Sequence, residues 1–170
     1  MQTTMQNPAQ QASTTDLESV TSADLVVLEL DVPDRETAVG VLAERLHAAG
    51  RIENLGRFLS EVDRREHQLA TGLPGGIGIA HARSEETTRA SIAIGVVAFG
   101  KGVDFGAVDG VAQMVLLLAT PAASYSAHLN MLAALARSLA KDSFRTSLRR
   151  ANDAEVIAEL INSTLDFSRV

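Results

Sequence analysis

Residues 92–99, IAIGVVAF, and residues 114–118, MVLLL, decide the fold class of this chain. Neither stretch alternates apolar with polar residues, as a strand with one face in water does. The first is followed by Gly100-Lys101-Gly102 and the second stops at Thr120-Pro121. Continuous apolar runs of this length are typical of central strands that are covered on both faces. We therefore predict an α/β fold in which helices flank a sheet on both faces.

The segments around these two runs complete the α/β pattern. Residues 25–28, LVVL, predict a strand that stops before Pro33, and Asp34 is placed to cap the helix that follows. Residues 77–79 predict another strand, after a glycine-rich loop at residues 72–76. The strands are short, and we expect them to form a mixed sheet. Apolar residues at helical spacing predict helices over residues 38–46, stopping at Gly50, and over residues 55–62, 129–139, 143–151 and 153–161.

The composition is that of an ordinary globular domain. The 170 residues correspond to one domain, and 46% of them are apolar. The formal net charge of −6 opposes attraction to nucleic acids and to anionic membranes. The longest apolar runs are also far shorter than the roughly 20 residues of a membrane-spanning helix. We expect neither nucleic-acid binding nor direct insertion into a membrane.

Residues 1–20 are predicted to be a flexible tail, and residues 21–170 a single domain. The first 20 residues are rich in Gln, Thr, Ser and Ala, and they offer too little apolar surface to offset the entropy cost of ordering. They also lack the positively charged start and the apolar stretch of a secretory signal. We therefore expect a cytoplasmic protein.

The chain contains no cysteine, so covalent chemistry must use hydroxyl, carboxylate or imidazole groups. Of the four histidines, His47 and His67 lie in polar or helix-end surroundings and are expected to be structural or exposed. His81 ends the predicted strand, and the small residues next to it should leave room for another molecule. His128 lies in the first turn of a predicted helix, from which it can face that strand end.

A phosphoryl group suits an imidazole in this position. Neutral imidazole is a nucleophile near pH 7, because its unperturbed pKa is about 6.5. Such a site also needs a guanidinium and further donors for the phosphoryl oxygens. The available residues are Arg65, Thr71, the glycines of residues 72–76 and His128. The glycines do not form a nucleotide-binding loop, because no Gly-Lys-Ser/Thr sequence follows them.

Four short segments occur together in a specific combination. They are Arg65-Glu66, Thr71-Gly72, residues 76–81 (GIGIAH) and residues 127–129 (AHL). In this combination they resemble the IIA domains of the sugar phosphotransferase system, in the fructose/mannitol class. The resemblance runs from about residue 25 to residue 161, and it implies the α/β sandwich of that class.

The resemblance also implies a role for each matching residue. His81 matches the histidine that accepts the phosphoryl group, and His128 matches the second histidine that supports it. Arg65 matches the arginine that faces the phosphoryl oxygens. The residues expected to support or position the site are Glu66 and Thr71.

The function implied by the resemblance is that of a phosphocarrier without a cofactor or a metal. His81 would accept the phosphoryl group from the histidine phosphocarrier protein and pass it to a cysteine on the IIB component. IIB would in turn serve the membrane component IIC, which takes up a sugar that we expect to be fructose. Since this chain has no thiol, the next acceptor must lie on another domain. One position departs from the family, since Ala80 stands where proline usually precedes the active histidine.

Two other interpretations fit the same residues. A nitrogen-type IIA protein would be phosphorylated on the same histidine but would regulate partners instead of feeding a transporter. A metal-binding or other small α/β protein would carry the histidines incidentally. For the phosphocarrier, one hypothesis is that Leu73, Phe99 and Phe105 form an apolar rim around His81 that serves as the docking surface, and the alternative is that these residues belong to the core.

Overall fold

The computed structural model describes residues 19–66, 72–123 and 125–166 of the chain. The strands are β1 (Val26–Leu30), β2 (Gly72–Leu73), β3 (Ile77–Ser84), β4 (Ser91–Val97) and β5 (Met114–Pro121). The helices are the short 3-10 helix η1 (Ala23–Leu25), α2 (Arg35–Ala48), α3 (Leu55–Glu66), α4 (Tyr125–Leu139), α5 (Asp142–Arg150) and α6 (Ala154–Asp166). No helix in these ranges combines the length and apolar character that a membrane span requires.

The five strands form one mixed sheet in the order β1-β4-β5-β3-β2. Strand β1 runs parallel to β4, and β3 runs parallel to β5, whereas β4 and β5 are antiparallel, as are β2 and β3. The two apolar runs of the sequence become β4 and β5, next to each other in the middle of the sheet. Every residue of β5 from Met114 to Thr120 is buried, which confirms that it is covered on both faces.

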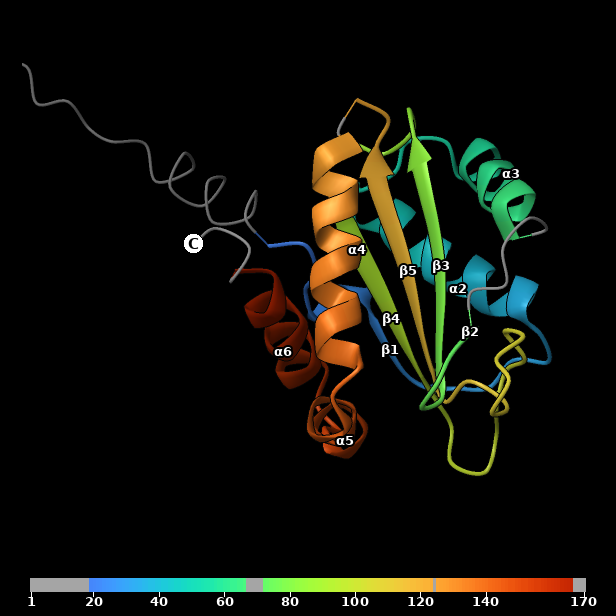
Figure 1. Cartoon of the computed structure of the whole chain (residues 1–170). Helices are drawn as coiled ribbons and strands as arrows, with labels where there is room; N and C mark the ends of the chain where they lie inside the picture. The colour runs from blue at the N-terminus through green and yellow to red at the C-terminus, as the bar shows by residue number, and fades with distance from the viewer. Residues whose placement is uncertain (1–18, 67–71, 124, 167–170) are drawn as a thin grey trace, which may run out of the picture.

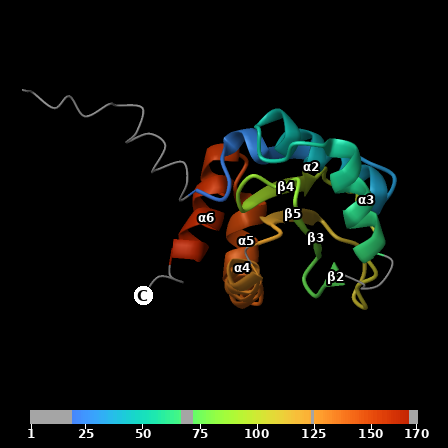
Figure 2. The same cartoon turned by 90° about the horizontal axis from the view of Figure 1, so that it is seen from above.

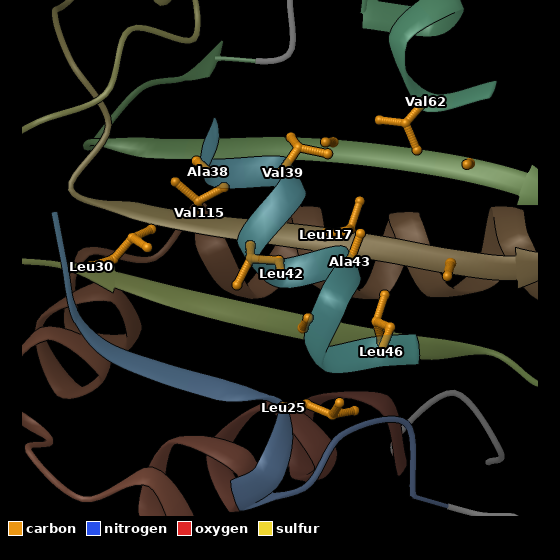
Figure 3. Packing of buried hydrophobic residues seen from close by; sticks show 14 of the residues in the cluster. Leu25, Leu30, Ala38, Val39, Leu42, Ala43, Leu46, Val62, Val115 and Leu117 are labelled. Carbon is orange, nitrogen blue, oxygen red and sulfur yellow. The ribbon is translucent and has the colours of Figure 1, made fainter. Parts of the chain in front are cut away.

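Helices cover both faces of this sheet (Figures 1 and 2), as predicted. Helices α2 and α3 pack on one face, and α4, α5 and α6 pack on the other. Strand β5 contributes buried side chains to the cores on both faces of the sheet, because successive side chains point to opposite faces. Val115 and Leu117 belong to the hydrophobic cluster of the α2 layer, where Ala43 of α2 lies beside Leu117 (Figure 3). Leu116 and Leu118 belong to the hydrophobic cluster of the α4–α6 layer.

Helix α2 begins and ends at residues that the sequence singles out. The Asp34 carboxylate accepts hydrogen bonds from the Thr37 N–H at 2.8 Å and from the Thr37 hydroxyl at 2.7 Å, which confirms Asp34 as the N-cap. At the other end, Gly50 follows the C-cap with a φ of 75°, a conformation that glycine adopts without a steric cost. The chain then reverses into α3, so both helices lie on the same face of the sheet.

The part of the predicted tail that the structure describes is short. Residues 1–18 lie outside the described residues, and the described chain begins at Ser19. Thr21 is held by α6, because the Asn162 side chain accepts a hydrogen bond from the Thr21 N–H at 3.2 Å and donates one to the Thr21 carbonyl at 3.0 Å. Thr21 is therefore anchored to α6, and the prediction of a flexible tail falls largely outside the described residues.

Candidate functional site

Strand β3 leaves two of its eight residues partly exposed, and both carry polar side chains. These residues are His81 and Arg83, whereas the other six are buried. The prediction that the strand ends at His81 is wrong, because β3 continues to Ser84. Its parallel partner β5 supports this extension, since His81 pairs with Leu118 and Ser84 with Pro121. His81 therefore lies within a regular strand, which fixes the direction of its side chain.

His81 and Arg83 share the face of the sheet that α4, α5 and α6 cover. Side chains two residues apart on a strand point to the same face, and Ile79 belongs to the hydrophobic cluster of the α4–α6 layer. Ala80 and Ala82 point to the opposite face and are fully buried beneath α2 and α3. These small residues therefore allow close packing of the α2 layer, and the prediction that they make room at the imidazole is wrong.

The partial exposure of His81 follows from its place at the margin of the sheet. Strand β2 pairs with β3 only at Gly72 with Gly78 and at Leu73 with Ile77. From Ile79 onward, no strand in the described part of the chain lies along this edge of β3. Figure 2 shows β3 between α3, on one side of the sheet, and α4, on the other. The imidazole is thus carried by a rigid element beside an edge that no strand of the described residues covers.

Helix α4 brings His128 to the face of the sheet that carries His81. The helix begins at Tyr125, four residues after β5 ends at Pro121. Its first turn, which contains His128, therefore lies near the carboxyl end of β5 (Figure 1). The partial positive charge at the start of a helix favours an anion in this region. Helix α4 and His81 therefore share one face of the sheet, and the pairing of the two histidines stays a prediction.

The structure describes the other predicted site residues only in part. Arg65 and Glu66 form the last turn of α3, which contacts β3 from the α2 side of the sheet. Their side chains and that of His128 lie outside what the structure describes, and Thr71 falls wholly outside the described residues. The roles assigned to these residues remain predictions.

The glycine-rich turn before β3 is held by protein groups and lies far from His81. The Gly75 N–H donates a hydrogen bond of 2.9 Å to the Asp109 carboxylate, so this N–H is not available to a phosphoryl group. The side chain of Arg145 packs directly against Gly75. Five residues of extended strand separate Gly76 from His81, a distance of about 16 Å. The prediction that these glycines supply donors at His81 is therefore wrong, and their role is to shape the turn.

The predicted apolar rim does not surround His81. Phe105 is fully buried, with its ring against Gly78 and the Arg35 guanidinium 5.6 Å from the ring centroid. Phe99 is fully exposed but follows the end of β4, next to the start of β5. The prediction fails for both residues because one fills the core and the other lies at the opposite end of the sheet. Leu73 is half-buried and packs against the α4–α6 cluster.

The chemical groups that the described part of the site offers are an imidazole and a guanidinium. Among the described residues, no three His, Asp or Glu side chains form a group that could hold a metal ion. The Thr37 hydroxyl and N–H lower the pKa of the Asp34 carboxyl, but this residue caps α2 in another layer. His81 can act as a nucleophile, and Arg83 can hold an anion.

A family model covers nearly all of the described chain. The model for the EIIA 2 component of the phosphoenolpyruvate-dependent sugar phosphotransferase system matches residues 19–164. The chain belongs to this family. The resemblance drawn from the sequence motifs is thereby confirmed, as is the assignment to the phosphotransferase components of the system.

Curated relatives of this EIIA 2 chain include both separate and fused components. The fructose-specific EIIA component of Haloferax volcanii is 29% identical over 153 residues, which cover 89% of this chain and 98% of that protein. The fructose-specific EIIABC component of Bacillus subtilis is 28% identical over 141 residues. The 2-O-alpha-mannosyl-D-glycerate-specific EIIABC component of Escherichia coli is 29% identical over 149 residues. This chain spans only about a fifth of these two fused proteins, 21% and 22% of their lengths.

Solved structures of IIA proteins share the fold of this EIIA 2 chain. The nitrogen regulatory protein IIA-Ntr from Neisseria meningitidis superimposes with a TM-score of 0.74 at 22% identity, over 85% of this chain and 97% of that chain. The IIA mannitol protein from Escherichia coli gives a TM-score of 0.69 at 21% identity, over 82% and 97%. A complex of IIA and phosphorylated IIB from the same mannitol system gives a TM-score of 0.70 at 18% identity, over 84% and 96%. The predicted α/β sandwich of the fructose/mannitol IIA type is confirmed.

Proposed function

We propose that this EIIA 2 chain is a phosphocarrier that accepts a phosphoryl group on His81 and passes it to a IIB component. The observation that carries the proposal is the place of His81 on β3. It is one of two partly exposed residues of a strand that is otherwise buried, at the margin of the sheet and on the face that carries the first turn of α4. This arrangement presents a nucleophilic imidazole to a docked protein while the strand holds it in position.

The reaction that we propose at His81 is an exchange of one nitrogen–phosphorus bond for another. A ring nitrogen of His81 uses its lone pair to form a bond to the phosphorus of a phosphohistidine on the donor. The donor bond breaks, and its electron pair stays on the donor imidazole. The proposed donor is the histidine phosphocarrier protein. Positioning and charge stabilisation dominate such transfers, and neither a metal nor a cofactor takes part in the proposed step.

In the second step, the phosphoryl group leaves for a cysteine thiolate on IIB. The sulfur forms a bond to phosphorus, and the electron pair of the broken nitrogen–phosphorus bond returns to His81. The absence of cysteine from this chain requires an acceptor on another domain. The complex of mannitol IIA with phosphorylated IIB from Escherichia coli supports an acceptor of this kind.

The proposed path continues to the membrane component IIC and ends on a sugar. Fructose is the proposed sugar, because the Haloferax volcanii and Bacillus subtilis relatives are named fructose-specific. Residues 21–170 are proposed to act as one cytoplasmic IIA domain, and residues 1–20 as a flexible tail. His128 and Arg65 are proposed to stabilise the phosphorylated imidazole, with Glu66 and Thr71 in supporting positions.

The forward transfer tests this function directly. The chain is phosphorylated with labelled phosphoenolpyruvate and the general phosphotransferase proteins, purified, and mixed with a fructose-type IIB. We expect the label to move to the IIB cysteine, and a IIB variant with serine at that cysteine to receive none. Phosphorylation of this chain without transfer to fructose-type or mannitol-type IIB would favour the nitrogen-type regulatory alternative. His47→Gln is a matched control, because His47 lies on α2 and its Nδ1 is 3.2 Å from the Ile52 carbonyl oxygen.

A further inference from the structure

Arg83 is the second partly exposed residue of β3, and none of the functional roles described above uses it. It follows His81 by two residues, so the two side chains leave the strand on the same face. Their backbone pairs, Leu118 and Thr120, are buried residues of strand β5. Both side chains therefore start from a rigid surface with a defined direction.

The spacing lets the Arg83 guanidinium reach a group attached to His81. Two residues of strand separate the Cα atoms by about 6.6 Å. An arginine side chain extends over a comparable distance, and a phosphoryl group on a ring nitrogen projects away from the strand. A guanidinium beside that group can donate two parallel hydrogen bonds to its oxygens, a geometry that arginine offers and lysine does not.

Glu86, the second carboxylate after β3, is held by groups at the start of α3. Glu86 accepts a hydrogen bond of 3.0 Å from the Asn54 N–H, and one of its oxygens lies 3.6 Å from the Arg57 guanidinium. Glu86 is thus held toward the start of α3, on the α2 side of the sheet. Arg83 leaves β3 on the opposite face of the sheet, which it shares with His81.

A phosphoryl group on His81 needs cationic partners on this face. The chain has a net charge of −6, which by itself disfavours the added negative charge of a phosphoryl group. Arg65, the arginine assigned by the motifs, comes from α3 in the other helix layer. Arg83 shares the strand and the face of His81, so its position does not depend on how α3 packs.

We propose that Arg83 binds the phosphoryl group on His81 through its guanidinium and stabilises the transfer in both directions. This inference rests on the proposed phosphocarrier function and adds a second arginine to its site. Arg83 forms no covalent bond and moves no proton in the step. It balances the negative charge of the three equatorial oxygens while the bond to phosphorus is exchanged.

The test is the single-turnover rate at which the phosphorylated histidine phosphocarrier protein transfers its group to the full chain. We expect Arg83→Gln to slow this transfer by about 100-fold, the lower end of the range found when one donor to a developing charge is removed. Arg83→Lys should recover only part of the lost rate, because lysine restores the charge but cannot donate the two parallel hydrogen bonds. Arg150→Gln should leave the rate unchanged, since Arg150 is an exposed arginine on α5, away from the carboxyl end of β3 (Figure 1).

The outcomes separate this inference from the proposed function. If the unchanged chain is phosphorylated on His81 and Arg83→Gln reacts within about twofold of it, the role of Arg83 is overturned while the phosphocarrier function stands. If the unchanged chain takes up no phosphoryl group, both are overturned. A phosphorus NMR signal of the phosphohistidine that shifts in Arg83→Gln but not in Arg150→Gln would support direct contact. Should Arg83→Gln fail to fold, Arg83→Lys decides: a rate equal to that of the unchanged chain overturns the two-pronged contact.

Discussion

Gly78 lies against the ring of Phe105 so closely that a Cβ atom on Gly78 would come within 2.5 Å of a ring carbon. Phe105 is fully buried and anchors the β4–β5 connection beneath the α2 layer. The contact ties this connection to β3 three residues before His81. The glycine is therefore required for packing, since its absent side chain is the space that the ring fills.

We predict that Gly78→Ala destabilises the protein by about 1–3 kcal/mol, because a methyl group overpacks a rigid contact. Urea unfolding measures this free energy. Gly40→Ala is the matched control, since nothing lies within 4 Å of the added Cβ atom. Gly40 is in the helix α2, where alanine should add about 0.5–1 kcal/mol of stability. Equal changes in the free energy of unfolding for Gly78→Ala and Gly40→Ala would contradict the packing role of Gly78.

Gly75→Ala should destabilise the turn before β3 more than Gly100→Ala destabilises its own loop. Both glycines have positive φ, 91° and 78°, so each substitution carries a conformational cost of about 1 kcal/mol. A Cβ atom at Gly75 would also come within 2.8 Å of the Arg145 guanidinium carbon, whereas Gly100 has open space around it. Arg145 cannot easily yield, because it donates a 2.6 Å hydrogen bond to the Leu139 carbonyl.

A double-mutant cycle isolates the steric part of that effect. We expect the cost of Gly75→Ala to fall toward that of Gly100→Ala when Arg145 is already alanine, because the clash is then absent. Thermal or urea unfolding of the four variants supplies the free energies. An unchanged cost in the Arg145→Ala background would show that the backbone conformation alone accounts for the glycine.

The N-cap of α2 predicts a pH dependence of stability. Hydrogen bonds from the Thr37 hydroxyl and N–H hold the pKa of the Asp34 carboxyl below its ordinary value. A group with a lowered pKa in the folded state stabilises it fully above the unfolded pKa, about 3.9, and loses this contribution as the pH falls through the folded value. Asp34→Ala should therefore lower the Tm at pH 6, and the difference from the unchanged chain should shrink below about pH 4. A difference that grows on acidification would contradict this assignment.

Much of the fold could be predicted because two apolar runs allow few alternatives. A run such as residues 114–118 can be buried on both sides only as a central strand or a buried helix, and its length and flanking turn favour the strand. It became β5, the strand with the most complete burial. The caps of α2 were predictable for a similar reason, since Asp34 and Gly50 act through local backbone geometry.

The surroundings of His81 were harder to predict, because they depend on contacts between distant parts of the chain. The residues adjacent in sequence, Ala80 and Ala82, point to the opposite face. The exposure of His81 comes from the short pairing of β2, which no pattern in the sequence specifies. Phe99 and Phe105 are six residues apart, yet one is exposed and the other fully buried. Arg83 could have been found, since strand alternation alone places it on the face of His81.

Phosphorylation of His81 is the event on which the proposed phosphocarrier function depends most directly. The chain is incubated with phosphoenolpyruvate and the general phosphotransferase proteins, digested at a pH that preserves phosphohistidine, and mapped by mass spectrometry. We predict one acid-labile phosphoryl group on His81, which is lost in His81→Gln and retained in His47→Gln. A fully folded chain that gains no phosphoryl group, or gains it on another residue and keeps it in His81→Gln, would contradict the account.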